Sequence, residues 1–127
     1  MTDNVPHFPG RAAIDAYGDG GFRFADMSHK GSLLLLPSGV YGWPVTETAL
    51  STPEDFAAVF AEAGDVAFLI FGCGDEFVLP PRPVREAFAA ANIGLEPMDT
   101  GAAARTFNVL LAEGRAVAAA LIAVDEP

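Results

Sequence analysis

The chain has 127 residues, a length that suits one domain. Hydrophobic residues make up 51% and charged residues 19%, a composition too apolar for an intrinsically disordered protein. The formal net charge is -10 and the seven Lys and Arg residues are scattered along the chain, which excludes binding to nucleic acid through a basic patch and disfavours anionic lipid surfaces.

Cysteine content and hydropathy indicate the compartment. Cys73 is the one cysteine, so no intrachain disulfide is possible, which fits a reducing compartment. The apolar runs are much shorter than the roughly 20 residues of a membrane-spanning helix, and residues 1–12 resemble neither a secretory signal nor a transit peptide. We therefore expect a cytoplasmic protein of bacterial type, without direct membrane insertion and peripheral to the inner membrane only through a partner. Residues 1–12 are predicted as a loose arm and residues 13–127 as one domain.

The first part of the chain predicts two β-hairpins. Apolar and polar residues alternate on both sides of a Gly-Asp-Gly-Gly turn, which predicts a hairpin over residues 14–24. A second hairpin is predicted over residues 32–43. Its continuous Leu run, residues 33–36, is typical of a strand covered on both faces.

The remaining chain alternates helices and strands. Thr52 and Thr100 are predicted helix N-caps, and Gly64 is predicted as a left-handed helix stop. The predicted elements are a helix over 52–63, a strand over 66–71, a loop over 72–76, a helix over 83–91, a strand over 95–98, a helix beginning at Thr100 and a strand over 117–124. The order β-α-β-α-β implies a parallel unit. Since the hairpins add antiparallel strands, the predicted fold is an α/β three-layer domain with a mixed sheet.

Several segments together resemble one small α/β family. They are Gly31-Ser32-Leu33-Leu34-Leu35-Leu36-Pro37, Trp43-Pro44, Gly72-Cys73-Gly74, Glu96-Pro97-Met98-Asp99-Thr100, Ala104-Arg105-Thr106-Phe107-Asn108-Val109-Leu110 and Glu113-Gly114-Arg115. The family includes the mitochondrial NADH:ubiquinone oxidoreductase (complex I) assembly factor 3, uncharacterised bacterial proteins and an adipogenesis-associated vertebrate relative. The resemblance spans roughly residues 12–124. It implies a three-layer domain with a mixed sheet and supplies no catalytic residues; relatives often have Thr where this chain has Cys73.

One predicted edge of the sheet is a candidate ligand site. The carboxyl ends of parallel strands meet at the edge where open α/β sheets bind ligands, and exposed backbone N–H groups there can hold an anion. The candidate ligand-binding residues are Gly72, Cys73, Gly74, Thr100, Gly101, Arg105 and Asn108. The alternative is a tight turn and a capped helix, since Asp75 and Glu76 beside the loop would repel phosphate. Likewise, Arg105 and Asn108 either bind an anionic group or hold loops and helix ends by hydrogen bonds.

Catalytic chemistry has weak support in the sequence. Cys73 would need a base or an orienting partner to act as a nucleophile, and the two histidines, His7 and His29, lie in N-terminal segments. A small buried or half-buried thiol is the favoured interpretation. We predict no catalytic residue, no metal site and no cofactor.

Tyr41 and Trp43 are candidates for a partner surface, because aromatic anchors dominate the energy of many interfaces. The alternative is that both belong to the core.

The leading hypothesis is a non-enzymatic interaction protein with a protein client, an assembly or biogenesis factor for respiratory complex I or another inner-membrane complex. The alternative hypothesis is a small-molecule or anion binder that uses the predicted strand-end edge. The sequence leaves the client and the oligomeric state open.

Overall fold

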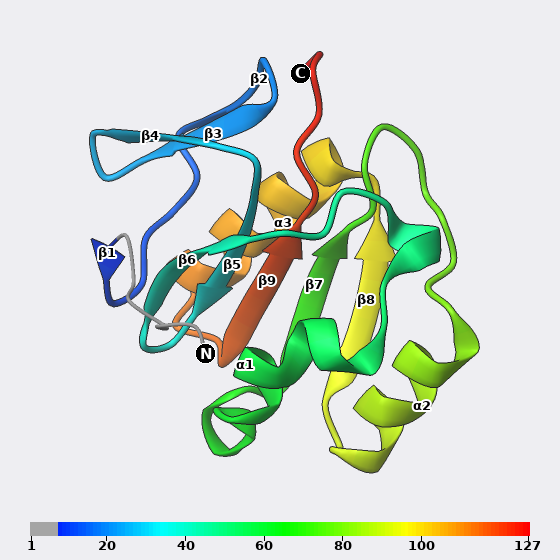
Figure 1. Ribbon diagram of the computed structural model, residues 1–127. Helices are drawn as coiled ribbons and strands as arrows, with labels where there is room; N and C mark the ends of the chain where they lie inside the picture. The colour runs from blue at the N-terminus through cyan, green and yellow to red at the C-terminus, as the bar shows by residue number, and fades with distance from the viewer. Residues whose placement is uncertain (1–7) are drawn as a thin grey trace.

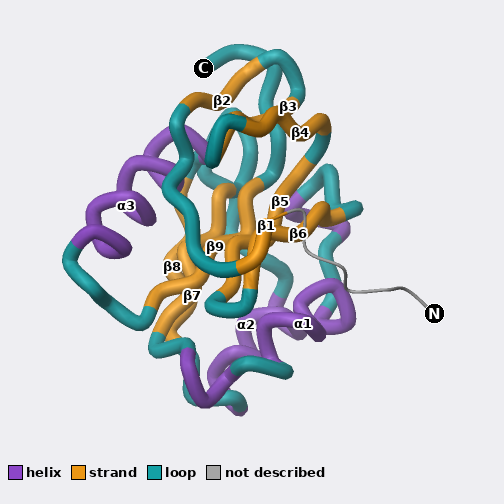
Figure 2. Tube along the Cα trace, turned by 90° about the vertical axis from the view of Figure 1, so that its left-hand side faces the viewer, coloured by secondary structure: helices purple, strands orange, loops and turns teal. Residues whose placement is uncertain are grey.

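The computed structural model describes residues 8–127 and has three layers around a six-stranded sheet (Figures 1 and 2). The sheet order is β1-β6-β5-β9-β7-β8. Its strands are β1 (Phe8–Pro9), β5 (Ser32–Leu36), β6 (Gly39–Trp43), β7 (Phe68–Gly72), β8 (Gly94–Met98) and β9 (Val117–Leu121). The helices are α1 (Ala57–Phe60), α2 (Arg82–Ala90) and α3 (Thr100–Ala112). Figure 2 shows α3 on one side of the sheet and α1 and α2 on the other.

The main sheet is mixed, as the sequence predicts. β7 lies in the parallel part and pairs with both β8 and β9. β9 then pairs antiparallel with β5, and β5 pairs antiparallel with β6. All five residues of β5 are buried, which confirms that the Leu run is covered on both faces. The predicted α/β class and mixed sheet are confirmed.

The first predicted hairpin forms but does not join the main sheet. β2 (Ala16–Gly18) and β3 (Gly21–Phe24) pair with each other, and β3 also pairs with β4 (Met27–Lys30) to give a separate three-stranded sheet. Phe22 and Phe24 are buried in the same hydrophobic cluster as Phe107 of α3. The hairpin therefore covers one face of the main sheet instead of extending its edge, which corrects the expected arrangement. The unpredicted strand β4 has an exposed Ser28 and Lys30, so it carries little hydrophobic signal.

The helix predicted over residues 52–63 is divided into short turns. These are the 3-10 turn η2 (Pro53–Phe56), α1 and the 3-10 turn η3 (Ala63–Asp65). Thr52 marks the start as predicted, and its backbone N–H donates to the Asp55 carboxylate at 2.8 Å. Gly64 is not a left-handed stop, because it lies inside η3 and Val66 closes that turn by donating its N–H to the Ala63 carbonyl.

β8 is one outer strand of the main sheet and contains a proline. Gly94 donates its N–H to the Ala67 carbonyl at 3.0 Å, and the Met98 carbonyl accepts from Cys73 N–H at 2.8 Å. In a parallel pair, every second residue of a strand directs its backbone N–H and C=O toward the neighbouring strand. Gly94 and Met98 belong to the set that bonds to β7, so Pro97 belongs to the other set and presents its backbone to the open side. Proline there removes no hydrogen bond from the β7–β8 ladder.

The predicted N-terminal arm, residues 1–12, lies partly outside the described residues. Within the described part, Phe8–Pro9 forms β1 and pairs with Val40 and Gly39 of β6. The division into an arm and one domain stays a prediction.

Candidate functional site

Thr100 joins three pieces of chain at the carboxyl ends of the parallel strands. Its side chain is fully buried. The Thr100 hydroxyl donates to the Ile122 carbonyl at 2.7 Å and accepts from Gly74 N–H at 3.0 Å. Thr100 N–H also donates to the Gly74 carbonyl at 2.9 Å. The Gly74 N–H, which the sequence offers to an anion, is thus bound within the protein.

The cap of α3 is Asp99 and not Thr100. The Asp99 carboxylate accepts from Ala102 N–H at 2.9 Å. Thr100 is the first residue of the helix, and its hydroxyl points away to the strand ends. The sequence prediction of a Thr100 cap is therefore wrong by one residue. Asp and Thr are both good caps, and only the fold shows that Thr100 is buried at the strand ends while Asp99 caps the helix.

Gly72 and Cys73 lie beneath the surface of this edge. A Cβ on Gly72 would meet Leu121 Cδ2 at 2.9 Å and Thr100 Oγ1 at 3.1 Å, so close packing requires glycine there. Cys73 is 5% exposed, and its Sγ lies 3.2 Å from the Val78 carbonyl. The structure places Cys73 as a buried thiol, which agrees with the favoured interpretation of this residue.

Three of the candidate residues meet at one depression. A hollow of about 330 Å³ brings together Gly74, Gly101 and Arg105 with Tyr17, Asp75, Asp99, Val124, Glu126 and Pro127. Tyr17 comes from β2, and its hydroxyl lies 3.5 Å from a guanidinium nitrogen of Arg105. A Cβ on Gly101 would stand 2.5 Å from the Tyr17 hydroxyl, so glycine makes room for this ring. The carboxylates outnumber Arg105, so the field in the hollow disfavours a free anion.

Asn108 holds the chain and lies outside this hollow. Its side-chain amide donates to the Ile14 carbonyl at 2.8 Å and accepts from Ile14 N–H at 2.8 Å. Both hydrogen bonds tie α3 to the segment before the small sheet. Of the two interpretations of Asn108, the structure supports the loop-holding one.

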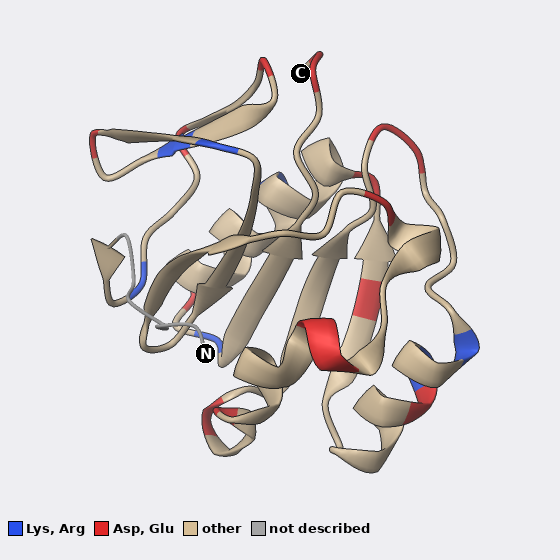
Figure 3. Ribbon diagram, viewed as in Figure 1, with Lys and Arg blue, Asp and Glu red and all other residues tan. Residues whose placement is uncertain are grey.

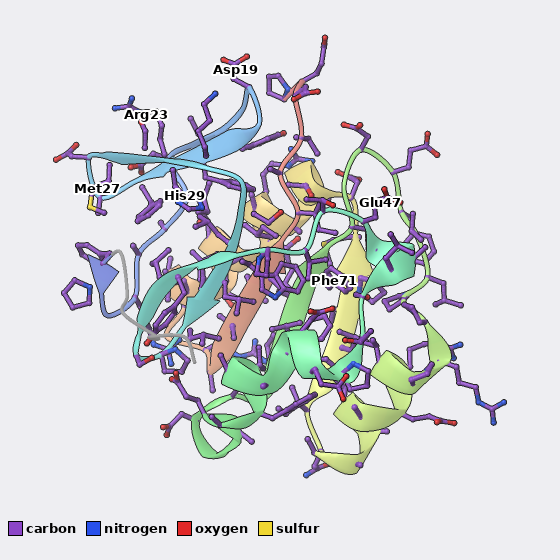
Figure 4. The ribbon with its side chains drawn as sticks, viewed as in Figure 1. Asp19, Arg23, Met27, His29, Glu47 and Phe71 are labelled. Atoms are coloured by element: carbon purple, nitrogen blue, oxygen red, sulfur yellow. The ribbon has the colours of Figure 1, made fainter. Side chains whose placement is uncertain are left out.

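Trp43 belongs to the core, which corrects its assignment to a partner surface. It is 6% exposed, and its indole N–H donates to the Asp55 carbonyl at 2.7 Å. The ring packs against Phe56 and Phe71 with centroid distances of 5.3 and 5.9 Å. Figure 4 shows Phe71 among the side chains that cover the face of β7. Tyr41 is half-buried, and its hydroxyl lies 2.6 Å from Ser38 Oγ.

Four of the five large apolar side chains that are exposed in the described residues lie elsewhere, on two segments that the sequence did not single out, and the fifth is Val109 on α3. The four are Leu50, in the 3-10 turn η1 (Thr48–Leu50), and Phe77, Val78 and Leu79, in the loop between β7 and α2. We call these four residues the apolar ridge. The signal available in the sequence was a short apolar run between the acidic pair Asp75 and Glu76 and the prolines that precede α2.

A second hollow lies between these two segments. Its volume is about 270 Å³, and its lining includes Ala49, Val78 and Ile122 with the acidic residues Glu47 and Asp75. Figure 4 shows Glu47 beside the loop that follows β7. Figure 3 shows acidic positions on this loop and at the C-terminus, along one end of the main sheet.

Within residues 8–127, no group of three His, Cys, Asp or Glu side chains is placed to hold a metal ion. None of the described helices has the length and apolar character needed to cross a membrane.

Comparisons with known proteins give one matching family, several related sequences and solved structures of similar fold. A family described as a protein of unknown function (DUF498/DUF598) matches residues 14–122. An uncharacterised protein of Rhodobacter capsulatus is 38% identical over 122 residues, which cover 96% of this chain and 93% of that protein. The NADH dehydrogenase (ubiquinone) 1 alpha subcomplex assembly factor 3 of Mus musculus is 32% identical over 115 residues, which cover 91% of this chain and 62% of that protein. A crystal structure described as an outer membrane protein from Bartonella henselae has a TM-score of 0.90 at 53% identity, covering 94% of this chain and 100% of that one.

Proposed function

We propose that this chain, which belongs to the DUF498/DUF598 family, is a non-enzymatic interaction protein. Its proposed role is in the assembly or biogenesis of a respiratory complex or another inner-membrane complex. The observation that carries the proposal is the 32% identity over 115 residues to a protein named as an assembly factor. This chain spans 62% of that relative's length, so its own client is part of the proposal. We propose that it works from the cytoplasmic side and meets the membrane through the client.

The geometry of the strand ends supports a binding role over a catalytic one. The polar groups that the sequence offered for ligand chemistry make internal hydrogen bonds, namely Gly74 N–H with the Thr100 hydroxyl and the Asn108 amide with Ile14. Cys73 is buried. These groups stabilise the edge, whereas the apolar ridge beside it is open to solvent.

The test is deletion of the gene in the organism that carries it, followed by native gel electrophoresis of its membrane complexes. We expect a reduced amount of one assembled complex and accumulation of its free subunits, both restored by the full chain. The tagged full chain, captured after gentle solubilisation, should enrich subunits of that same complex over an untagged control. Unchanged amounts of every respiratory and inner-membrane complex after deletion would overturn the proposal.

The second candidate function is binding of a small molecule in the hollow at Gly74, Gly101 and Arg105. The observation in its favour is Arg105 held beside the Tyr17 hydroxyl over a glycine-lined opening. A thermal-shift screen that sets neutral and zwitterionic compounds beside nucleotides, phosphates and carboxylates should then give a stabilising compound whose effect disappears in Arg105→Ala. Because carboxylates outnumber Arg105 in this hollow, we expect that compound to carry a cationic or neutral part as well as a group that Arg105 binds. Stabilisation that is equal in Arg105→Ala and the parent chain would place the compound elsewhere.

A further inference from the structure

The apolar ridge exposes large side chains that a folded domain ordinarily buries. The exposed fractions are 71% for Leu50, 57% for Phe77, 37% for Val78 and 56% for Leu79. Single exposed apolar residues are common on proteins, whereas Phe77, Val78 and Leu79 follow one another on one loop, and η1, which carries Leu50, lines the same hollow as Val78. Clustered exposed apolar residues mark interaction surfaces.

The backbone beneath the ridge is held by specific hydrogen bonds. The Thr48 hydroxyl donates to the Cys73 carbonyl at 2.9 Å, which fixes η1 against the loop after β7. The Cys73 thiol lies 3.2 Å from the Val78 carbonyl, and Arg85 Nε donates to the Pro80 carbonyl at 3.0 Å. These contacts hold the loop at Val78, in the middle of the run 77–79, and at Pro80, directly after it, so little further ordering is needed when a partner binds.

The hollow between η1 and the loop combines apolar lining with acidic side chains. Ala49 and Val78 line it from the two segments of the ridge, and Glu47 and Asp75 line the same space. No Lys or Arg of the described residues lines this hollow. Of the cations nearest in sequence, Arg82 pairs with Glu86 at 2.8 Å, and Arg85 bonds to the Pro80 carbonyl at the end of the loop, outside this hollow.

We infer that this surface, the apolar ridge with Glu47 and Asp75, docks a cationic amphipathic segment of a protein partner. The apolar side chains of that segment pack on Phe77, Leu79 and Leu50, and its Lys or Arg side chains meet the carboxylates. Charge complementarity selects this occupant, because an anionic lipid surface or an acidic segment would be repelled by these carboxylates and by the net charge of -10. The inference rests on the proposed function in that the segment belongs to the client.

The chain offers a matched control for the ridge. Val109 is 56% exposed, as Leu79 is. It lies on α3, across the main sheet from α1 and α2. Replacing it by serine removes the same kind of exposed apolar side chain from a residue that lines neither of the two hollows at the strand ends.

The experiment measures binding of a fluorescent amphipathic peptide of Leu and Lys, about 18 residues long so that it can form a helix, to the full chain. A peptide in which Glu replaces every Lys is the charge control. We expect the Lys peptide to bind and the double variant Phe77→Ser, Leu79→Ser to weaken binding about tenfold or more. Val109→Ser should bind as the parent does. Glu47→Gln with Asp75→Asn should weaken binding and flatten its dependence on salt.

Several outcomes would overturn the inference. They are no binding of the Lys peptide to the parent chain, equal losses in the ridge and Val109 variants, or tighter binding to the Glu peptide. Adsorption to vesicles of anionic phospholipid through Phe77 and Leu79 would assign the ridge to a membrane instead of a protein.

The surface and the proposed function fail in different ways. If deletion of the gene reduces a membrane complex and the Phe77→Ser, Leu79→Ser variant restores it fully, the function stands and the ridge does not serve it. If the purified chain binds the Lys peptide through the ridge and deletion changes no complex, the docking surface stands and the assembly role does not.

Discussion

The buried aromatic cluster and the apolar ridge use the same kinds of side chain in opposite ways. Trp43, Phe56 and Phe71 pack ring against ring between the main sheet and the turns around α1. Phe77 and Leu79, a few residues beyond Phe71, are more than half exposed. The first group lies on strands and turns whose alternate residues face the core, whereas the second lies on a loop with no such repeat. In these two regions, the apolar residues on regular elements lie in the core and those on the irregular loop lie on the surface.

The substitution Trp43→Ala, in the buried aromatic cluster, should lower the stability of the fold the most. Removing a ring in contact with Phe56 and Phe71 leaves a cavity and deletes the hydrogen bond to the Asp55 carbonyl. We expect the free energy of unfolding to fall by about 3–5 kcal/mol. Urea unfolding followed by circular dichroism measures this, because the variant lacks the chain's one Trp. Trp43→Phe, which retains a ring, should lose much less. An unchanged unfolding midpoint in Trp43→Ala would contradict the assignment of Trp43 to the core.

The substitution Thr100→Val should lower the stability of the fold by an intermediate amount. It tests the hydrogen bonds at the edge of the sheet beside the apolar ridge. It keeps the shape of the side chain but deprives Gly74 N–H and the Ile122 carbonyl of their partner. We expect a loss of about 1–3 kcal/mol in the free energy of unfolding. Thr100→Ser keeps the hydroxyl and serves as the control. Equal losses in both variants would mean that the methyl group, and not the hydrogen bonds, provides the stability.

The double substitution Phe77→Ser, Leu79→Ser should have the smallest effect on folding. Both side chains are mostly in water already, so we expect the free energy of unfolding to stay within about 0.5 kcal/mol of the parent value. The same urea titration checks this. A loss comparable to that of Trp43→Ala would show that the ridge belongs to the core, and the contrast between the two regions would disappear.

The parts of the fold that sequence predicted well are those with a continuous hydrophobic pattern. The Leu run of β5, the strands β7 and β9 and the apolar faces of α2 and α3 carry such a pattern. The strand β4 does not, because Ser28 and Lys30 are exposed. The separation of the small sheet was also hidden, since an alternating strand shows which of its faces is buried but not whether it joins a sheet edge or covers a sheet face.

The candidate site was predictable only in part. Gly74, Gly101 and Arg105 meet as expected, because they follow or begin elements at the carboxyl ends of parallel strands. Tyr17 arrives from the distant small sheet, and no spacing in the sequence joins these two segments. The burial of Thr100 depends on a carbonyl after β9, a partner that becomes visible only when the strands are in place.

Pro97, on the open side of β8, limits how copies of this protein and other chains can associate with it. A sheet edge can recruit a foreign strand through its free N–H groups, which is how edge-to-edge aggregation begins. With proline at that position, the β8 edge offers no donor there and makes a poor template. Pro97 thus directs association away from strand addition and toward contacts made by side chains.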